Sequence, residues 1–258
     1  MIDKELYLKQ DGKDMNIAII FAGGVGKRMN SKVKPKQFIT IQGKPIIIQT
    51  LEKFDKHKDI DAIVVACVSD WIDYLKELIT QYHINKVKKI VPGGKTGQLS
   101  IYQGLKVAKE IAQTEKSIVL VHDGVRPMIT EKLISDNICM VKERGSAITC
   151  VKVNETVLEV KEDGEIIDIP TRENSRLARA PQSFWLDDIL KAHEKAISEE
   201  KYDFIDSCSM MRYYGNDLYL IEGPRDNIKI TTPEDFYIMR ALLDAKENSQ
   251  IYGVENDE

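Results

Sequence analysis

The sequence predicts a three-layer α/β/α fold with a mainly parallel sheet. Short apolar runs alternate with amphipathic stretches along most of the chain, and the first run leads directly into a glycine-rich loop. Alternation of this kind requires crossover connections, which place helices on both faces of a parallel sheet. After residue 153 the pattern changes to a polar segment with a hairpin signal, so we expect a smaller β element there.

The apolar runs predict five buried strands, because each is short and flanked by turn residues. They are Ile17–Phe21, Ile63–Val68, Val87–Val91, Ile118–Val121 and Ala147–Val153. Between and after them, apolar residues recur at three- and four-residue intervals, as in an amphipathic helix. The predicted helices are Pro45–Phe54, Asp70–Tyr82, Gly97–Ile111, Thr130–Glu143, Leu186–Ser198 and Pro233–Lys246.

The polar segment at about residues 154–180 predicts a protruding β-arm. Two weakly alternating stretches, Val157–Val160 and Ile166–Ile169, flank Glu162–Glu165, a strong hairpin-turn signal. A two-stranded ribbon buries too little surface to be stable alone, so we expect it to pack on another subunit. We expect residues 16–246 to form one domain that includes this arm, with residues 1–15 as an N-terminal extension and 247–258 as a C-terminal tail.

Composition restricts the function classes. The chain has 258 residues, 43% hydrophobic and 30% charged, with a net charge of −4, which is ordinary for a globular protein. A nucleic-acid surface would need a basic tract, and none is visible. No apolar run approaches the roughly 20 residues that span a bilayer, and the N-terminus lacks a signal-peptide pattern. We therefore expect a cytoplasmic protein without membrane or nucleic-acid partners. The four cysteines lack metal or disulfide spacing and predict buried free thiols.

The glycine loop, Ala22–Met29, predicts a site for a nucleotide triphosphate. Glycines let backbone N–H groups approach phosphates, while Arg28 and Lys36 add the positive charge that a pyrophosphate leaving group needs. A dinucleotide fingerprint would require a third glycine where Met29 stands, and a P-loop would require a hydroxyl residue after Lys27. A structural glycine turn after a strand remains the alternative.

Two carboxylates are candidate magnesium ligands. Asp123 follows the strand Ile118–Val121, which places it at the carboxyl edge of the sheet near the glycine loop, and Asp226 is the second candidate. Asp226 is also compatible with a turn before a short strand at Asn227–Ile230. Arg126 either binds phosphate or braces the turn at Pro127. His122 is interpreted as a core histidine.

Three motifs resemble one known family. The glycine loop with Pro35–Phe38, then His122–Pro127, then Asp226–Lys229 followed by Thr231–Asp235 are similar to the cytidylyltransferases that activate polyol phosphates with CTP. The resemblance extends from about Asn16 to about Ala245. It implies a Rossmann-like nucleotidyltransferase fold, a Mg²⁺-dependent reaction and a homodimer held by the β-arm.

The resemblance also implies roles for particular residues. Arg28, Lys36 and Lys229 match the family's catalytic cations, and Thr156 and Arg172 match positions that contact the polyol phosphate. Arg172 lies on the arm and would serve the neighbouring subunit. The expected CTP-binding residues are Ala22, Gly23, Gly24, Gly26, Gly94, Ser100, Asp123 and Arg126.

Family members act on 2-C-methyl-D-erythritol 4-phosphate or on ribitol 5-phosphate. Ala180 and Ile205 stand where the family usually has threonine, so the acceptor side has lost two hydroxyls. The segment Asp168–Arg172 is closer to the ribitol phosphate branch, which supplies teichoic acid or capsule synthesis, and we prefer that branch. Another pentitol phosphate is the third possibility.

Two other classes of function compete with this interpretation. A nicotinamide-dependent oxidoreductase predicts an acidic residue about 20 positions after the glycine loop, where the chain has Gln42–Pro45. A catalytically silent nucleotide sensor would have no need for both leaving-group cations and metal ligands. The sequence therefore favours a cytidylyltransferase.

Overall fold

The computed structural model describes residues 14–23, 34–112, 114 and 116–252 and is built on a seven-stranded sheet. The strand order is β11-β7-β10-β6-β1-β4-β5, and every neighbouring pair is parallel except the two that include β10. The predicted mainly parallel sheet is thus confirmed. Its strands are β1 (Asn16–Ala22), β4 (Ala62–Cys67), β5 (Val87–Pro92), β6 (Ile118–Asp123), β7 (Ser146–Lys152), β10 (Arg176–Trp185) and β11 (Leu220–Glu222).

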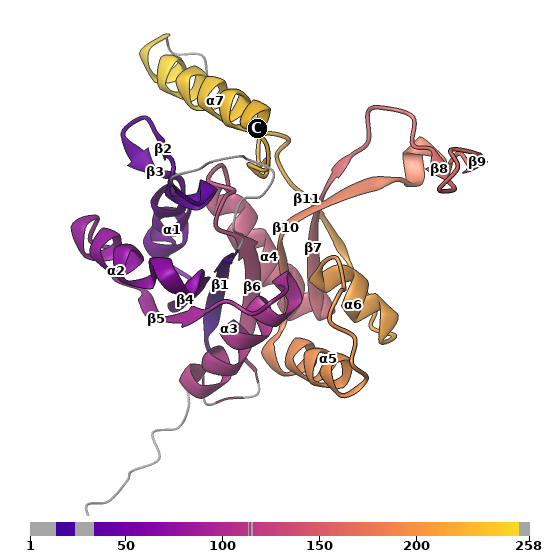
Figure 1. Cartoon of the computed structure of the whole chain (residues 1–258), viewed down its shortest axis with the longest axis horizontal. Helices are drawn as coiled ribbons and strands as arrows, with labels where there is room; N and C mark the ends of the chain where they lie inside the picture. The colour runs from indigo at the N-terminus through magenta and orange to yellow at the C-terminus, as the bar shows by residue number, and fades with distance from the viewer. Residues whose placement is uncertain (1–13, 24–33, 113, 115, 253–258) are drawn as a thin grey trace, which may run out of the picture.

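Helices cover both faces of the sheet, as the alternating sequence pattern predicts (Figure 1). Along β1, Ala18 and Ile20 pack into one apolar cluster while Ile17 and Ile19 pack into the other. The first cluster lies against α1 (Ile46–Lys56), α2 (Ile72–Gln81) and α4 (Glu131–Arg144), and the second lies against α3 (Gly97–Ala112), α5 (Leu186–Ser198) and α6 (Ser207–Tyr213). Burying each large aliphatic side chain contributes roughly 1.5–3 kcal/mol, so these two clusters hold the layers together.

Strand β10 was missing from the sequence prediction. It lies between β6 and β7 and runs antiparallel to both, with a register shift between Ala178 and Gln182. Pro181 falls inside that shift, where a residue without an N–H group is tolerated. Pro181 and the charged Arg176 and Arg179 interrupt the apolar pattern, so periodicity does not reveal this strand. The same irregularity places Arg179 at the functional edge described below.

A protruding arm forms as predicted, between β7 and β10, and extends away from the central sheet (Figure 1). Its strands β8 (Glu159–Val160) and β9 (Ile166–Asp168) pair antiparallel around Gly164, whose φ of 90° favours glycine. The 3-10 helix η4 (Arg172–Asn174) follows. Apolar side chains on the arm are about half exposed, namely Leu158, Val160, Ile166, Ile167, Ile169 and Leu177. A ribbon with this surface has an unsatisfied apolar face.

The C-terminal helix α7 (Pro233–Tyr252) is longer than predicted. No glycine or proline interrupts residues 247–252, so the helix continues beyond Lys246. Its Phe236 and Met239 pack on an apolar cluster that includes Ile41 from the small ribbon of β2 (Thr40–Ile41) and β3 (Lys44–Pro45). None of the helices in the described part of the chain is both long and apolar enough to cross a bilayer.

Two smaller predictions were wrong. Residues Asn227–Ile230 form a loop rather than a strand, since their backbone groups bond to side chains and to a turn instead of a neighbouring strand. Cys139 is exposed on α4, whereas Cys67 and Cys150 are buried and Cys208 is half-buried. Cys139 lies on the solvent side of an amphipathic helix, a placement that cysteine spacing alone does not reveal.

Candidate active site

Asp123 lies beside the end of β1, where the glycine loop begins. The parallel register pairs Phe21 of β1 with Asp123 of β6, and the Gly124 N–H donates to the Phe21 carbonyl at 3.1 Å. Parallel strands bring their carboxyl ends to one edge, and ligands bind at that edge in open α/β sheets. The His122–Pro127 turn is therefore held next to the start of the glycine loop.

Asp123 forms ion pairs with two cations. Its Oδ2 accepts from Nε of Arg126 at 2.7 Å, and its Oδ1 lies 2.5 Å from Nζ of Lys229. Burial alone would raise the pKa of Asp123, but the charges and hydrogen bonds of Lys229 and Arg126 lower it to about 2. The carboxylate is consequently ionised at neutral pH, and the three side chains form a preorganised charged cluster.

Asn227 connects this cluster to β10, a role that sequence reasoning missed. Its backbone carbonyl accepts from Nη1 of Arg126 at 2.9 Å and from Nη1 of Arg179 at 3.0 Å. Its side-chain amide donates to the Ala180 carbonyl at 2.8 Å, and the residue is fully buried. The position of Asn227 between two candidate site residues, Asp226 and Lys229, was the available signal.

His122 has the structural role that we expected. It is fully buried, packs on Phe54 with ring centroids 5.1 Å apart, and its Nε2 bonds to the Arg126 carbonyl at 3.1 Å. Burial lowers its pKa to about 4, so the ring is neutral at physiological pH. A neutral imidazole at this position closes the turn that carries Asp123.

The predicted base-binding residues Gly23, Gly94 and Ser100 come together at the ends of β1 and β5. The Gly94 N–H donates to the Ser100 hydroxyl at 3.0 Å, and that hydroxyl donates to the Thr96 carbonyl at 2.9 Å. A Cβ on Gly23 would lie 3.0 Å from the Ser100 Oγ, and one on Gly94 would lie 2.5 Å from the Leu99 Cβ. These glycines are thus required by close packing.

The segment with Lys36 is fastened to the end of β1 by Gln37. Lys36 begins the 3-10 helix η2 (Lys36–Phe38), and the buried Gln37 amide donates to the Ala22 carbonyl at 2.6 Å. Phe38 stacks on Trp71 with ring centroids 5.0 Å apart. These contacts place Lys36 at the edge that carries Gly23. Gly24, Gly26 and Arg28 lie outside the described residues.

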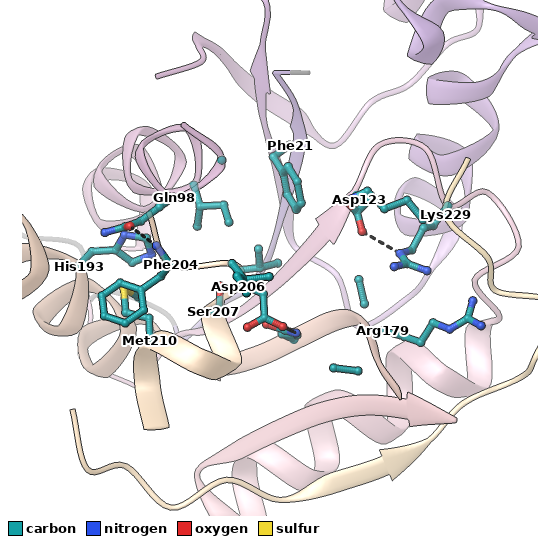
Figure 2. Close-up of a pocket in the computed structure, with 18 residues that line it drawn as sticks. Phe21, Gln98, Asp123, Arg179, His193, Phe204, Asp206, Ser207, Met210 and Lys229 are labelled. Carbon is teal, nitrogen blue, oxygen red and sulfur yellow. Dashed lines mark hydrogen bonds and ion pairs between the residues drawn. The ribbon is translucent and has the colours of Figure 1, made fainter. Parts of the chain in front are cut away.

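A cavity of about 320 Å³ opens beside the charged cluster (Figure 2). Asp123, Lys229 and Arg179 lie at one end, while Gln98, His193, Phe204 and Met210 lie at the other, with Asp206 and Ser207 between them. Ala180 and Ile205, the two positions where threonine is usual, also line it. Its volume is within the range of small-molecule sites.

Thr156, Arg172 and Asp226 lie outside this cavity's lining. Thr156 and Arg172 are exposed on the arm, where Nη2 of Arg172 donates to the Thr156 hydroxyl at 3.4 Å. Asp226 is half-buried, and its Oδ2 pairs with Nζ of Lys246 at 3.0 Å. The chain's own arm therefore does not deliver Arg172 to the chain's own cavity.

A divalent cation is compatible with the carboxylates present. The described residues contain no group of three or more acidic, histidine or cysteine side chains that would form a closed metal cage. Mg²⁺, however, usually takes one or two carboxylates and completes its shell with water and substrate phosphates. Asp123 lines the cavity and is ionised, and Oδ1 of Asp226 is buried without a hydrogen-bond donor in the described part of the chain.

These features define the class of protein. An open, mostly parallel sheet that carries close-packed glycines, a buried carboxylate and several cations at its carboxyl edge is typical of enzymes that handle nucleotides. The sequence matches the family described as "IspD: 2-C-methyl-D-erythritol 4-phosphate cytidylyltransferase" over residues 16–245. The chain belongs to this family and is a cytidylyltransferase.

Two groups of curated relatives are similar to this chain. A ribitol-5-phosphate cytidylyltransferase of Streptococcus agalactiae serotype III is 52% identical over 240 residues, covering 93% of this chain and 100% of the relative. A 2-C-methyl-D-erythritol 4-phosphate cytidylyltransferase of Clostridium botulinum is 42% identical over 229 residues, covering 89% and 97%. The crystal structure of 4-diphosphocytidyl-2C-methyl-D-erythritol synthase from Anaerococcus prevotii superimposes with a TM-score of 0.77 at 29% identity, covering 90% of this chain and 96% of that one.

Proposed function

We propose that the protein transfers a cytidylyl group from CTP to ribitol 5-phosphate, giving CDP-ribitol and pyrophosphate. A phosphate oxygen of the acceptor attacks the α-phosphorus of CTP, and the bond from that phosphorus to the pyrophosphate oxygen breaks. The observation that carries this proposal is the cavity beside the Asp123 cluster, in which Ala180 and Ile205 replace the usual threonines. Relatives named for ribitol 5-phosphate are also more similar than those named for methylerythritol phosphate.

The chain's cations supply most of the catalysis in this proposal. Two anionic phosphates must approach each other, and charge then accumulates on the leaving pyrophosphate, so positioned positive charge stabilises the transition state. Arg28 and Lys36 act on the α-phosphate and the departing pyrophosphate. Lys229, which pairs with Asp123, would offset the charge between the two phosphates. Arg126 orients Asp123 through its 2.7 Å bond.

The nucleotide binds where β1 and β5 end. Ala22, Gly23 and Gly94 offer backbone groups to the cytosine and ribose, with Ser100 holding the Gly94 N–H in place. Gly24 and Gly26 contribute to the phosphate-binding loop. Backbone contacts of this kind select a base by the hydrogen-bonding pattern on its edge.

Mg²⁺ is part of the proposal, with Asp123 and Asp226 as its protein ligands. A bound cation neutralises triphosphate charge and orients the phosphates for in-line attack. Asp123 supports this role because it is ionised at the cavity, and Asp226 because its Oδ1 is buried without a donor among the described residues.

The arm supports a homodimer in which each subunit completes its neighbour's site. Its six half-exposed apolar side chains need a partner surface, and Thr156 and Arg172 are exposed on the arm. In a dimer, Arg172 would reach the acceptor phosphate of the partner subunit. We place this enzyme in the cytoplasm, where free thiols such as Cys139 remain reduced.

Pyrophosphate release is the direct test. Purified protein with CTP and Mg²⁺ is assayed in parallel with ribitol 5-phosphate, arabinitol 5-phosphate and methylerythritol 4-phosphate. We expect the highest kcat/KM with ribitol 5-phosphate, and the loss of turnover when Mg²⁺ is chelated. Preference for methylerythritol 4-phosphate would assign the protein to isoprenoid synthesis, and no release with any acceptor would favour the nucleotide sensor.

A further inference from the structure

We infer that the acceptor binds in the cavity in a single orientation. Arg179 binds its phosphate, and its hydroxyl groups point toward Ser207 and His193. This inference rests on the proposed function and extends it to three residues that have no assigned role in the sequence motifs. It follows from the chemical difference between the two ends of the cavity, which Figure 2 shows on opposite sides of the view.

Arg179 gives the first end an excess of positive charge. Three cations line the cavity there, Arg126, Arg179 and Lys229, but Arg126 and Lys229 share the single carboxylate of Asp123. Arg179 forms no salt bridge within the described residues, and the half-buried side chain donates only to the Asn227 carbonyl. Burial and the nearby charge of Arg126 lower the pKa of Arg179.

An uncompensated guanidinium beside a second guanidinium is unfavourable without an anion. Both side chains use Nη1 on the same carbonyl, that of Asn227, which fixes them close together. The remaining N–H groups of Arg179 form a planar fork that matches two oxygens of a phosphate. The structure thus assigns the acceptor phosphate to this end, next to Lys229.

Toward the other end, the cavity carries neutral hydrogen-bonding groups without partners, with Ser207 midway along it and His193 at the far end (Figure 2). Oγ of Ser207 and both ring nitrogens of His193 are buried and have no hydrogen-bond partner among the described residues. His193 is 1% exposed and stacks on Tyr102, and burial lowers the pKa of His193 to about 4. A neutral imidazole and a hydroxyl suit the hydroxyl groups of a polyol rather than a second phosphate.

The other polar side chains at this end are already engaged in holding the protein together. Gln182 donates to Asp206 at 2.8 Å and accepts from the Cys208 N–H at 2.8 Å. Gln98 donates to the Lys201 carbonyl at 2.8 Å and accepts from the Phe204 N–H at 3.2 Å. Ser207 and His193 are therefore the groups left available to a ligand, since unpartnered buried polar groups are rare in native structures.

The role of Arg179 is tested by comparing the KM for ribitol 5-phosphate with the KM for CTP. For Arg179→Gln we expect the KM for ribitol 5-phosphate to rise roughly 10- to 100-fold, as for loss of a charge-assisted contact, with the KM for CTP within about twofold of wild type. Arg179→Lys should recover part of the loss, because it keeps the charge without the fork. Arg212→Gln, at an exposed arginine on α6, is the matched control and should behave as wild type.

Ser207 and His193 are tested by opposite effects on stability and binding. Ser207→Ala and His193→Phe each remove a buried polar group without a partner, so the melting temperature should stay the same or rise. The KM for ribitol 5-phosphate should nevertheless rise roughly 2- to 10-fold for each variant. A merely structural role predicts the reverse, with a lower melting temperature and an unchanged KM.

Calorimetric titration measures ligand binding without turnover, so it tests this inference separately from the proposed function. Ribitol 5-phosphate and inorganic phosphate are titrated into wild type and Arg179→Gln, so turnover is not needed. Weaker binding of both ligands to Arg179→Gln supports the assignment, even if the preferred acceptor in the turnover assay proves to be another polyol phosphate. Equal binding of both ligands by the two proteins, or equal acceptor KM values, would overturn it.

Discussion

The ammonium of Lys229 lies 2.5 Å from a carboxylate oxygen of Asp123, an ion pair between two motifs that are far apart in the sequence. This contact holds the loop after β11 against the end of β6. It also fixes a positive charge at the cavity, which the proposed reaction requires where the two phosphates meet.

Lys229→Met should lower kcat with CTP and ribitol 5-phosphate by roughly two to three orders of magnitude, because it removes a preorganised charge that acts in the transition state. Steady-state pyrophosphate release measures this effect. Lys132→Met is the matched control, since the exposed Lys132 forms an i,i+4 pair with Asp136 on α4. Comparable losses in both variants would contradict a specific role for Lys229.

Lys36→Ala should reduce turnover by orders of magnitude while the fold persists, because Gln37 and Phe38 keep the segment in place. Turnover and circular dichroism are measured together. Lys34→Ala is the comparison, because Lys34 is exposed and contacts the Tyr74 hydroxyl at 3.3 Å. Wild-type turnover in Lys36→Ala would remove Lys36 from the mechanism.

Mixed dimers should recover activity that neither parent variant has. In a dimer of one Lys229→Met subunit and one Arg172→Gln subunit, one site carries both defects and the other carries none, provided that Arg172 acts across the interface. We expect about half of wild-type turnover from purified mixed dimers with two different affinity tags. Activity no higher than that of the two parents would show that the arm serves its own subunit.

His193 should make stability depend on pH. Its pKa is about 4 in the folded protein against 6.5 for an ordinary histidine, so the unfolded chain binds the proton first as the pH falls. The free energy of unfolding therefore falls as the pH drops from about 6.5 to about 4, by about 3 kcal/mol in all.

The comparison between wild type and His193→Phe isolates this effect. Tyr102 stacks on the His193 ring, and Lys106 lies over the Tyr102 ring. Urea unfolding of both proteins at pH 7, 5.5 and 4 should show a smaller loss of stability in the variant. Parallel curves would mean that His193 does not carry the pH dependence.

Periodicity and motif spacing predicted most of the fold but not its antiparallel strand. The parallel strands and their helices follow from apolar residues at regular intervals, and the register then brings Asp123 to the end of β1. β10 is invisible to that approach, because Pro181 and Arg179 interrupt its pattern. The strand forms since β6 and β7 offer hydrogen-bonding edges on both sides, which only the tertiary structure supplies.

The candidate site likewise contains some residues that the sequence motifs predicted and others that only the structure reveals. The motif residues Asp123, Arg126 and Lys229 were predicted, and the structure brings them together. The roles of Asn227 and Gln37 were not predicted. Both depend on hydrogen bonds to backbone carbonyls, whose positions cannot be read from the sequence. Arg179, Ser207 and His193 lie on three separate elements, and only the folded chain puts them around one cavity.

Strand β10 connects the arm to the cavity. It leaves the arm at Arg176, passes Arg179 and Ala180 at the cavity, and ends at Trp185 within the central sheet. One continuous stretch of backbone therefore joins the arm to residues that line the cavity. In the proposed homodimer, docking of the neighbouring copy and recognition of the acceptor would both depend on this strand, so a substitution in it would affect both properties.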